Sequence, residues 1–132
     1  MCGINGIFNY ARVSIPDCLP LVEMMNQAVA HRGPDDSGLW GDNACGIYLG
    51  HRRLSILDLS EKGHQPMISP RKSTIVFNGE IYNFKDLRNS LQDRPFASDT
   101  DTEVLLALYD KEGEECLQSL NGMFSFAIWD AA

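Results

Sequence analysis

Cys2 is the residue of this chain that points most directly to covalent chemistry, because it follows the initiator methionine. Removal of Met1, which a small second residue permits, would place a thiol and a free α-amine on the same residue. An α-amine titrates near ~8, so it can accept the thiol proton and later return it to a leaving group. A second interpretation stays open, in which Cys2 is only a buried second residue.

Other residues could complete a site that binds an amino acid and stabilises an anion. Arg53 could bind a carboxylate through two parallel hydrogen bonds, and Asp101 could hold an ammonium group. Asn78 and Gly79 could aim a side-chain amide and a backbone N–H at a developing oxyanion. Each also has a purely structural interpretation: a surface arginine, a helix N-cap and a two-residue hairpin turn, respectively.

Metal and nucleotide chemistry find no matching motif. His31, His51 and His64 stand at no metal-ligand spacing with one another or with Cys45. Neither a dinucleotide fingerprint nor a phosphate loop occurs. We therefore expect no metal and no cofactor in this chain.

The composition excludes several classes of partner. The chain has 132 residues, is 44% hydrophobic and 22% charged, and carries a net charge of -7, so binding driven by nucleic-acid phosphates is not expected. No apolar run approaches the ~20 residues that span a bilayer, and the first residues lack the basic start of a signal peptide. A cytoplasmic protein without membrane contact, with its four scattered cysteines reduced, is the simplest prediction.

Hydrophobic periodicity predicts the elements that must position these residues. We expect strands over 3–10, 39–41, 45–49 and 123–129, helices over 16–30, from Asn83 onward and over Asp101–Glu112, and loops over 31–38 and 50–70. Asn78-Gly79 between the apolar runs 74–77 and 80–82 predicts a β-hairpin. Strands and helices thus alternate irregularly, which is typical of an α+β fold of one domain.

The last predicted strand looks buried, yet the chain ends three residues after it without a turn or a partner strand. We interpret the 132 residues as a fragment whose final strand leaves an unpaired hydrophobic edge. Association through that edge is the expected consequence.

Short motifs occur in one order along the whole chain, and together they resemble a known family. The motifs are Cys2-Gly3-Ile4, His31-Arg32-Gly33-Pro34-Asp35, Gly50-His51-Arg52-Arg53-Leu54-Ser55-Ile56, Gly63-His64-Gln65-Pro66-Met67, Asn78-Gly79-Glu80-Ile81-Tyr82-Asn83 and Asp101-Thr102-Glu103. This set is similar to the class II glutamine amidotransferase (glutaminase) domain at the N-terminus of glutamine-hydrolysing asparagine synthetases.

The resemblance implies a fold of the N-terminal nucleophile hydrolase type, a four-layer α/β/β/α sandwich of two antiparallel sheets, here incomplete at the C-terminus. Residues 1–132 would be a partial amidotransferase domain, and the ATP-dependent synthetase domain would be absent. ATP and magnesium are then expected only in that absent domain. It would be the partner of this domain in the full-length protein, and a homodimer stays open.

The resemblance also implies a role for each candidate residue in the hydrolysis of L-glutamine. Cys2 would attack the side-chain amide, and Asn78 with the Gly79 N–H would stabilise the oxyanion. The expected glutamine-binding residues are Arg53, Leu54, Ser55, Ile56 and Leu57, the last four on a strand, together with Asn78, Gly79, Glu80 and Asp101. Asp99 is a near-duplicate of Asp101, so the choice between them stays open, and the loop over 31–35 would support the nucleophile.

Two alternatives to an asparagine-forming enzyme remain at this stage. The ammonia could serve another acceptor, such as a sugar or a β-lactam precursor, because acceptor choice would reside in the absent domain. The chain could also be a non-catalytic fragment that retains the motifs without assembling the site.

Overall fold

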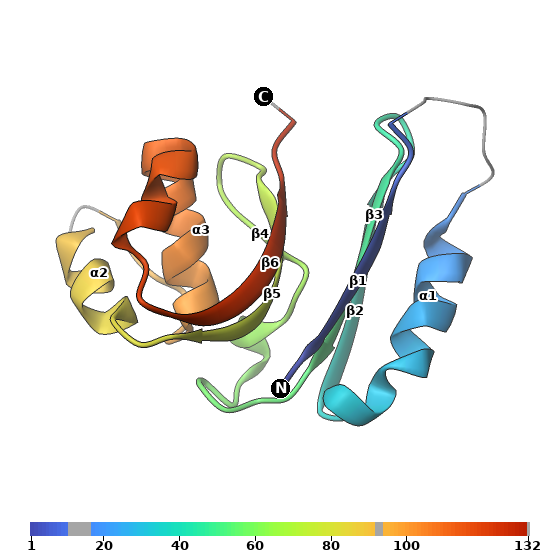
Figure 1. Cartoon of the computed structure of the whole chain (residues 1–132), viewed down its shortest axis with the longest axis horizontal. Coiled ribbons are helices and arrows are strands. Elements are labelled where there is room, and N and C mark those ends of the chain that lie inside the picture. The colour runs from blue at the N-terminus through green and yellow to red at the C-terminus, as the bar shows by residue number, and fades with distance from the viewer. Residues whose placement is uncertain (11–16, 92–93, 132) are drawn as a thin grey trace.

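Two three-stranded antiparallel sheets face each other, and helices cover their outer surfaces (Figure 1). The computed structural model describes residues 1–10, 17–91 and 94–131. The first sheet has the order β1 (Gly3–Phe8), β3 (Ile47–Arg53), β2 (Asp36–Asp42), and α1 (Leu19–Ala28) lies on its outer side. The second has the order β4 (Met67–Ile68), β5 (Thr74–Ile81), β6 (Gly122–Trp129), with α2 (Phe84–Ser90) and α3 (Asp101–Glu112) outside it. The expected four-layer α+β sandwich is confirmed.

The register of the first sheet brings the N-terminus to the end of β3. Gly3 pairs with Arg52, and Asp36 of β2 pairs with Arg53. Cys2 therefore lies beside the residues that follow Arg53. A short 3₁₀ helix, Ala30–Arg32, joins α1 to the loop before β2.

Strand β5 runs straight through Asn78 and Gly79, so the predicted hairpin is wrong. The partner of β5 is the distant strand β6, which pairs with it from Thr74↔Trp129 to Ile81↔Gly122. Gly79 serves that pairing with a φ of 155°, and a Cβ at this position would lie only 2.3 Å from the Met123 carbonyl oxygen. The glycine permits close strand approach rather than a turn.

Other boundaries also differ from the predictions. Strands β2 and β3 both extend further than expected, so 36–38 and 50–53 are strand rather than loop. The polar residues His51 and Arg53 of β3 are buried, which a search for alternating apolar residues cannot detect. Helix α1 is shorter than the predicted 16–30, of which Pro16 lies outside the described residues.

The two helices of the second half begin where predicted, with different capping from that expected. The N-cap of α3 is Thr100, whose Oγ1 accepts a hydrogen bond from the Glu103 N–H at 3.2 Å. Asn83 precedes α2, but its side chain bonds Ser119 and Asn121 instead of capping the helix. Gly113 ends α3 in a left-handed conformation, as predicted.

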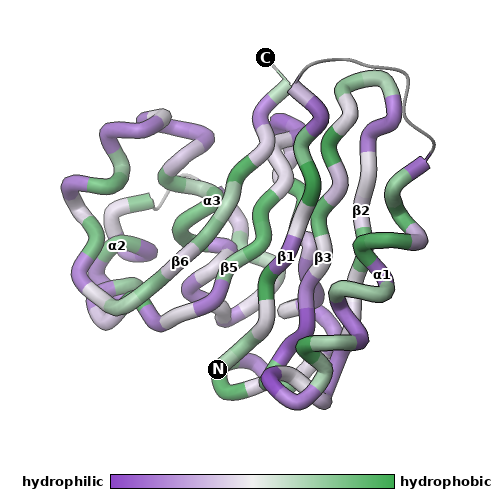
Figure 2. Tube along the Cα trace, turned by 45° about the vertical axis from the view of Figure 1, so that its right-hand side comes forward, coloured by the Kyte–Doolittle hydropathy of each residue, from purple (hydrophilic) through white to green (hydrophobic). Residues whose placement is uncertain are grey.

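The apolar core is unequal in its two halves. Figure 2 shows apolar residues, in green, along β3, β5 and α3. The larger cluster lies between the second sheet and the helices outside it; its buried members are Ile75, Phe77, Ile81, Leu91, Val104, Leu105, Leu106, Ala107, Leu108 and Cys116. A smaller cluster of Ile47, Leu49 and Val76 lies between the sheets. The second sheet and the helices outside it, which include β5 and α3, are thus the better packed part of the molecule.

Strand β6 is an edge strand rather than the buried strand predicted. Its paired neighbour among the described strands is β5 alone, and Met123 and Phe124 are exposed. Association of the chain through this edge stays a prediction, which sedimentation velocity would test. A monomer at micromolar concentration would contradict it.

Candidate active site

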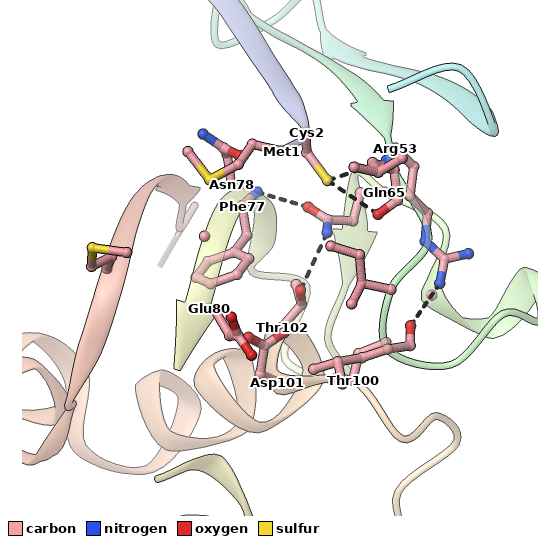
Figure 3. A pocket seen from close by; sticks show the side chains of 16 residues that line it. Met1, Cys2, Arg53, Gln65, Phe77, Asn78, Glu80, Thr100, Asp101 and Thr102 are labelled. Carbon is pink, nitrogen blue, oxygen red and sulfur yellow. Dashed lines mark hydrogen bonds between the residues drawn. The ribbon is translucent and has the colours of Figure 1, made fainter. Parts of the chain in front are cut away.

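A cavity of about 140 Å³ opens where the N-terminus, the end of β3, the middle of β5 and the first turn of α3 meet (Figure 3). Its walls are formed by Met1, Cys2, Arg53, Leu54, Ile56, Leu57, Gly63, Gln65, Phe77, Asn78, Gly79, Glu80, Thr100, Asp101, Thr102 and Met123. The structure therefore brings together residues from five of the six motifs. Of the residues predicted to form the site, Ser55 is the one that does not line this cavity.

Cys2 lines the cavity and contacts Leu54, the residue that follows β3. Its Sγ accepts a hydrogen bond from the Leu54 N–H at 3.4 Å and lies 3.7 Å from the Leu54 carbonyl oxygen. The Arg32 Nε donates to the Cys2 carbonyl at 3.0 Å, so the loop predicted to support the nucleophile does contact it. The sulfur faces a cavity, which favours the chemical interpretation of Cys2 over the packing interpretation.

Asn78 and Gly79 lie on the part of β5 that faces the cavity. The backbone N–H groups of Phe77 and Ile81 point away from β6, to Gln65 Oε1 at 2.7 Å and Asp101 Oδ2 at 3.0 Å. Because alternate residues of a strand direct their N–H groups to the same edge, the Gly79 N–H points to that edge as well. The Asn78 Oδ1 is buried and has no hydrogen-bond partner among the described residues.

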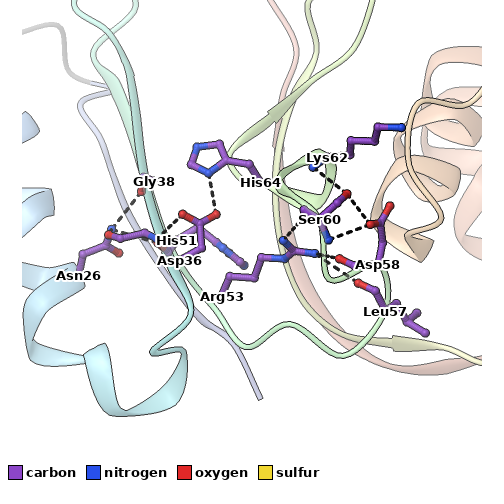
Figure 4. Close-up of polar contacts among 11 residues, drawn as sticks. Asn26, Asp36, Gly38, His51, Arg53, Leu57, Asp58, Ser60, Lys62 and His64 are labelled. Atoms are coloured by element: carbon purple, nitrogen blue, oxygen red, sulfur yellow. Dashed lines mark hydrogen bonds and ion pairs between the residues drawn. The ribbon is translucent and has the colours of Figure 1, made fainter.

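Arg53 is buried, 6% exposed, so its interpretation as a surface arginine is wrong. Its guanidinium donates to the carbonyl oxygens of Ser60 at 2.8 Å, of Leu57 at 3.3 Å and of Asp58 (Figure 4). Gly63 leaves room for it, since a Cβ there would lie 2.0 Å from its Nη2.

The charge of this guanidinium has no close ionic partner. In the described part of the chain no carboxylate lies within 4.0 Å of it. A buried arginine without a paired anion is costly. Arg53 is therefore well placed to accept a carboxylate from a ligand.

Two carboxylates face the opposite end of the cavity. Asp101 is 5% exposed, and burial raises the pKa of its carboxyl group, with the nearby Glu80 adding to the rise. The N–H groups of Ile81 and Thr102 oppose that rise by stabilising the charged form. A cationic ligand group here would relieve the repulsion between Asp101 and Glu80.

The near-duplicate Asp99 lies elsewhere. Its side chain is 85% exposed and forms an ion pair with Arg88 at 3.1 Å. Of the two aspartates that the sequence left open, Asp101 is the one at the cavity.

Residues 54–57 form a loop after β3 and not the expected strand. Leu54, Ile56 and Leu57 line the cavity, whereas the Ser55 N–H donates to Asp35 Oδ2 at 2.7 Å beside a different, polar cavity. The three carbonyl contacts of Arg53, to Leu57, Asp58 and Ser60, hold the end of this loop and the residues that follow it.

Sequence reasoning gave no role to Gln65, Thr102 or Phe77. Gln65 is buried; its Oε1 accepts the Phe77 N–H, and its Nε2 donates to Thr102 Oγ1 at 3.2 Å. For Gln65 and Thr102 the signal available was membership in the Gly-His-Gln-Pro-Met and Asp-Thr-Glu motifs, whereas Phe77 belongs to none of the motifs. A motif shows that a residue belongs to the site but not which atom it contacts.

Over residues 1–10, 17–91 and 94–131, no group of three or more His, Cys, Asp or Glu side chains is placed to hold a metal ion. In the same ranges no helix combines the length and the apolar character needed to cross a membrane.

Comparison with known proteins shows which family this chain belongs to. The model of the glutamine amidotransferase domain matches residues 1–132. The putative asparagine synthetase [glutamine-hydrolyzing] 2 of Methanocaldococcus jannaschii is 43% identical over 147 residues, covering 98% of this chain and 28% of that protein. Asparagine synthetase [glutamine-hydrolyzing] 1 of Bacillus subtilis is 45% identical over 134 residues, covering 98% and 21%.

Among solved structures, the glutamine phosphoribosylpyrophosphate amidotransferase of Bacillus subtilis superposes with a TM-score of 0.55 at 24% identity, over 67% of this chain and 23% of that one. This likeness shows the fold, a sandwich of two antiparallel sheets with helices on their outer surfaces. The chain spans between about a fifth and just over a quarter of the length of the two curated relatives. The chain belongs to the glutamine amidotransferase domain family, and within that family it is similar to the glutamine-hydrolysing asparagine synthetases.

Proposed function

We propose that this chain hydrolyses L-glutamine to glutamate and ammonia through a thioester on Cys2. One observation carries the proposal. A single cavity places a cysteine sulfur and the Asn78-Gly79 segment beside a pair of carboxylates and a buried arginine that has no ionic partner in the described part of the chain. These groups match the side-chain amide, the α-carboxylate and the α-ammonium of an amino acid such as glutamine.

Glutamine would be oriented by its two charged ends. Its α-carboxylate would bind the N–H groups of Arg53 that the carbonyls of the loop leave free. Its α-ammonium would bind Asp101 and Glu80, which would offset the burial and the repulsion from Glu80 that together raise the pKa of Asp101. The side-chain amide would then lie beside Cys2, because Cys2 lines the same cavity as Arg53 and Asp101.

The covalent step follows from this orientation. The Cys2 sulfur attacks the amide carbon, and the thiol proton passes to the α-amine of the same residue. The carbonyl oxygen becomes an oxyanion that the Asn78 amide and the Gly79 N–H stabilise. The C–N bond breaks, the α-amine gives its proton to the leaving nitrogen, and ammonia departs. Water then cleaves the thioester, releasing glutamate and restoring the thiol.

This step requires the removal of Met1. While Met1 is present, the α-amine belongs to Met1, and the nitrogen of Cys2 is a peptide nitrogen that cannot accept a proton. Met1 is 66% exposed and borders the cavity, so a methionine aminopeptidase can reach it. We propose that the mature chain begins at Cys2.

Glutaminase chemistry would be half of a larger reaction. We propose that ammonia passes to an ATP-dependent, aspartate-activating domain outside these residues, to which ATP and magnesium would bind. The names of the two curated relatives, which are several times longer than this chain, support asparagine as the product. An ammonia acceptor other than aspartate would leave the chemistry of this cavity unchanged.

Affinity labelling with a glutamine-like diazo-ketone tests the proposal. We expect the intact mass to show loss of Met1 and one adduct, mapped by peptide analysis to Cys2, with labelling blocked by excess glutamine. The Cys2→Ser variant should remain unlabelled. A processed chain that takes up no label and releases no ammonia from glutamine would overturn the proposal and favour a non-catalytic fragment.

A further inference from the structure

A buried imidazole joins the two sheets at the residue that precedes the proposed oxyanion donors Asn78 and Gly79. His51 lies on β3, is 0% exposed, and its Nε2 is 3.0 Å from the Phe77 carbonyl oxygen on β5. A carbonyl oxygen can only accept, so Nε2 carries the hydrogen. The other ring nitrogen, Nδ1, is buried without a hydrogen-bond partner among the described residues. This arrangement defines one neutral tautomer.

The hydrogen bond acts on the peptide that leads to Asn78. The Phe77 carbonyl and the Asn78 N–H belong to one planar peptide unit, so fixing the carbonyl fixes the direction in which Asn78 begins. The Phe77 N–H is also bound, because Gln65 Oε1 accepts its hydrogen bond at 2.7 Å. Both backbone polar groups of Phe77 are therefore held by buried side chains.

Ordinary strand pairing does not provide this support. Strand β4 pairs with β5 only at Thr74 and Ile75, so in the described sheet the cavity-facing edge of β5 has no strand beside it from Val76 onward. Side chains of His51, Gln65 and Asp101 take the place of that strand.

Packing alone does not account for an imidazole at this position. An unpartnered Nδ1 between two sheets is an unfavourable buried polar atom that an aliphatic side chain would avoid. The pairing of β6 with β5 along the whole strand already keeps β5 in its sheet. What His51 adds is the orientation of one peptide unit.

We propose that His51 is a positioning residue of the glutaminase reaction: its Nε2–H holds the Phe77 carbonyl and thereby aims the Asn78 amide and the Gly79 N–H at the oxyanion. The inference rests on the proposed function. Burial lowers the pKa of His51 to about 4, which keeps the ring in the neutral form near pH 7.

A matched pair of substitutions tests the hydrogen bond. In His51→Gln the side-chain amide nitrogen can occupy the place of Nε2 and donate to Phe77, whereas in His51→Asn the shorter side chain cannot reach. We expect His51→Asn to lower kcat for glutamine hydrolysis by about 10- to 100-fold, with KM within about threefold of wild type. His51→Gln should restore kcat to within about threefold of wild type. His64→Gln, which changes an exposed histidine, serves as the control.

A ligand comparison separates positioning from general damage to the site. The aldehyde analogue of glutamine, glutamate γ-semialdehyde, forms a tetrahedral adduct with a thiol, whereas glutamate binds without one. We expect His51→Asn to weaken aldehyde binding by the same factor as kcat and to leave glutamate binding within about threefold. Equal weakening of both ligands, or equal kcat in the two His51 variants, would overturn the inference.

A measurement on the wild-type chain needs no variant. Nitrogen-15 NMR of the His51 ring should show the Nε2–H tautomer at pH 7, and the Nδ1–H tautomer would overturn the proposal. Absence of glutamine hydrolysis by the wild-type chain would instead refute the proposed function itself, so the two failures are distinguishable.

Discussion

The two sheets contribute to the cavity in different ways. From the first sheet come Cys2 and Arg53, whose polar atoms are already bound to the loop that follows β3. From β5 come Asn78 and Gly79, of which the Asn78 oxygen has no partner among the described residues. The nucleophile side is thus preset by local hydrogen bonds, and the β5 side offers groups that a ligand can engage.

The two halves also differ in how they are held together. Helix α3 packs on the second sheet through the large apolar cluster. Between α1 and the first sheet lies a buried polar residue, Asn26, whose Nδ2 donates to the carbonyl oxygens of Gly38 at 3.0 Å and His51 at 3.2 Å. We infer that stability depends mainly on the second half, whereas activity requires both halves in register.

The largest expected effect separates Cys2 from the other thiols. Cys2→Ala should lower glutamine hydrolysis by at least about 10³-fold, because no other group can form the thioester. Glutamine binding, measured by calorimetry, should persist. Cys18→Ala, at the start of α1, is the matched control and should retain full activity; substantial turnover by Cys2→Ala would contradict covalent catalysis.

The inequality of the two cores predicts different costs for the same truncation. Leu105→Ala, inside the large cluster, should lower the free energy of unfolding by about 3–5 kcal/mol. Leu49→Ala, in the small cluster beside an apolar cavity of about 310 Å³, should cost about 2–3 kcal/mol, because fewer contacts are lost. Urea denaturation measures both, and a larger loss at Leu49 would reverse the comparison.

The lowered pKa of His51 predicts that the free energy of unfolding decreases in acid. Its pKa is about 4 in the folded chain against 6.5 for the free side chain, because burial disfavours the charged ring. The unfolded chain therefore binds an additional proton between these values. The free energy of unfolding should fall by up to about 3 kcal/mol as the pH falls from 6.5 to 4.

Urea denaturation at pH 7, 5 and 4 measures that slope. Asp101, with its raised pKa, acts in the opposite sense, so the wild type must be compared with His51→Gln rather than interpreted alone. The His51→Gln variant should show a flatter profile. An unchanged slope in the variant would place the acid sensitivity elsewhere.

The smallest expected effect distinguishes the two neighbouring aspartates. Asp101→Asn should raise KM for glutamine by about 10- to 30-fold through the loss of one charge from the ammonium site, since charge-assisted hydrogen bonds contribute about 1.5–3 kcal/mol. An asparagine oxygen can still accept the Ile81 N–H, so the fold should persist. Asp99→Asn is the control and should leave KM unchanged. Equal effects would remove the basis for assigning the ammonium to Asp101.

Local patterns predicted the elements whose neighbours in sequence determine them. Helix α3 was predicted with its observed bounds, because its apolar spacing and the terminating Gly113 are local features. The hairpin at Asn78-Gly79 failed because a turn signal cannot reveal a partner strand more than forty residues away, at Gly122–Trp129. The strand predicted over 54–57 was wrong for a similar reason. The loop that replaces it is held by contacts from Arg53 to the carbonyls of Leu57, Asp58 and Ser60, and no periodicity encodes such contacts.

By itself, the sequence determined the order of the motifs, the α+β class, and the residue types that glutamine hydrolysis requires. Only the tertiary structure decided which atoms meet: that Arg53 is buried with no ionic partner among the described residues, that Asp101 and not Asp99 faces the cavity, and that His51 bonds the carbonyl before Asn78. The physical reason is the distance along the chain over which each kind of signal acts. Propensity and periodicity act over one or two turns of chain, whereas these contacts join the two sheets and depend on the register with which distant strands pair.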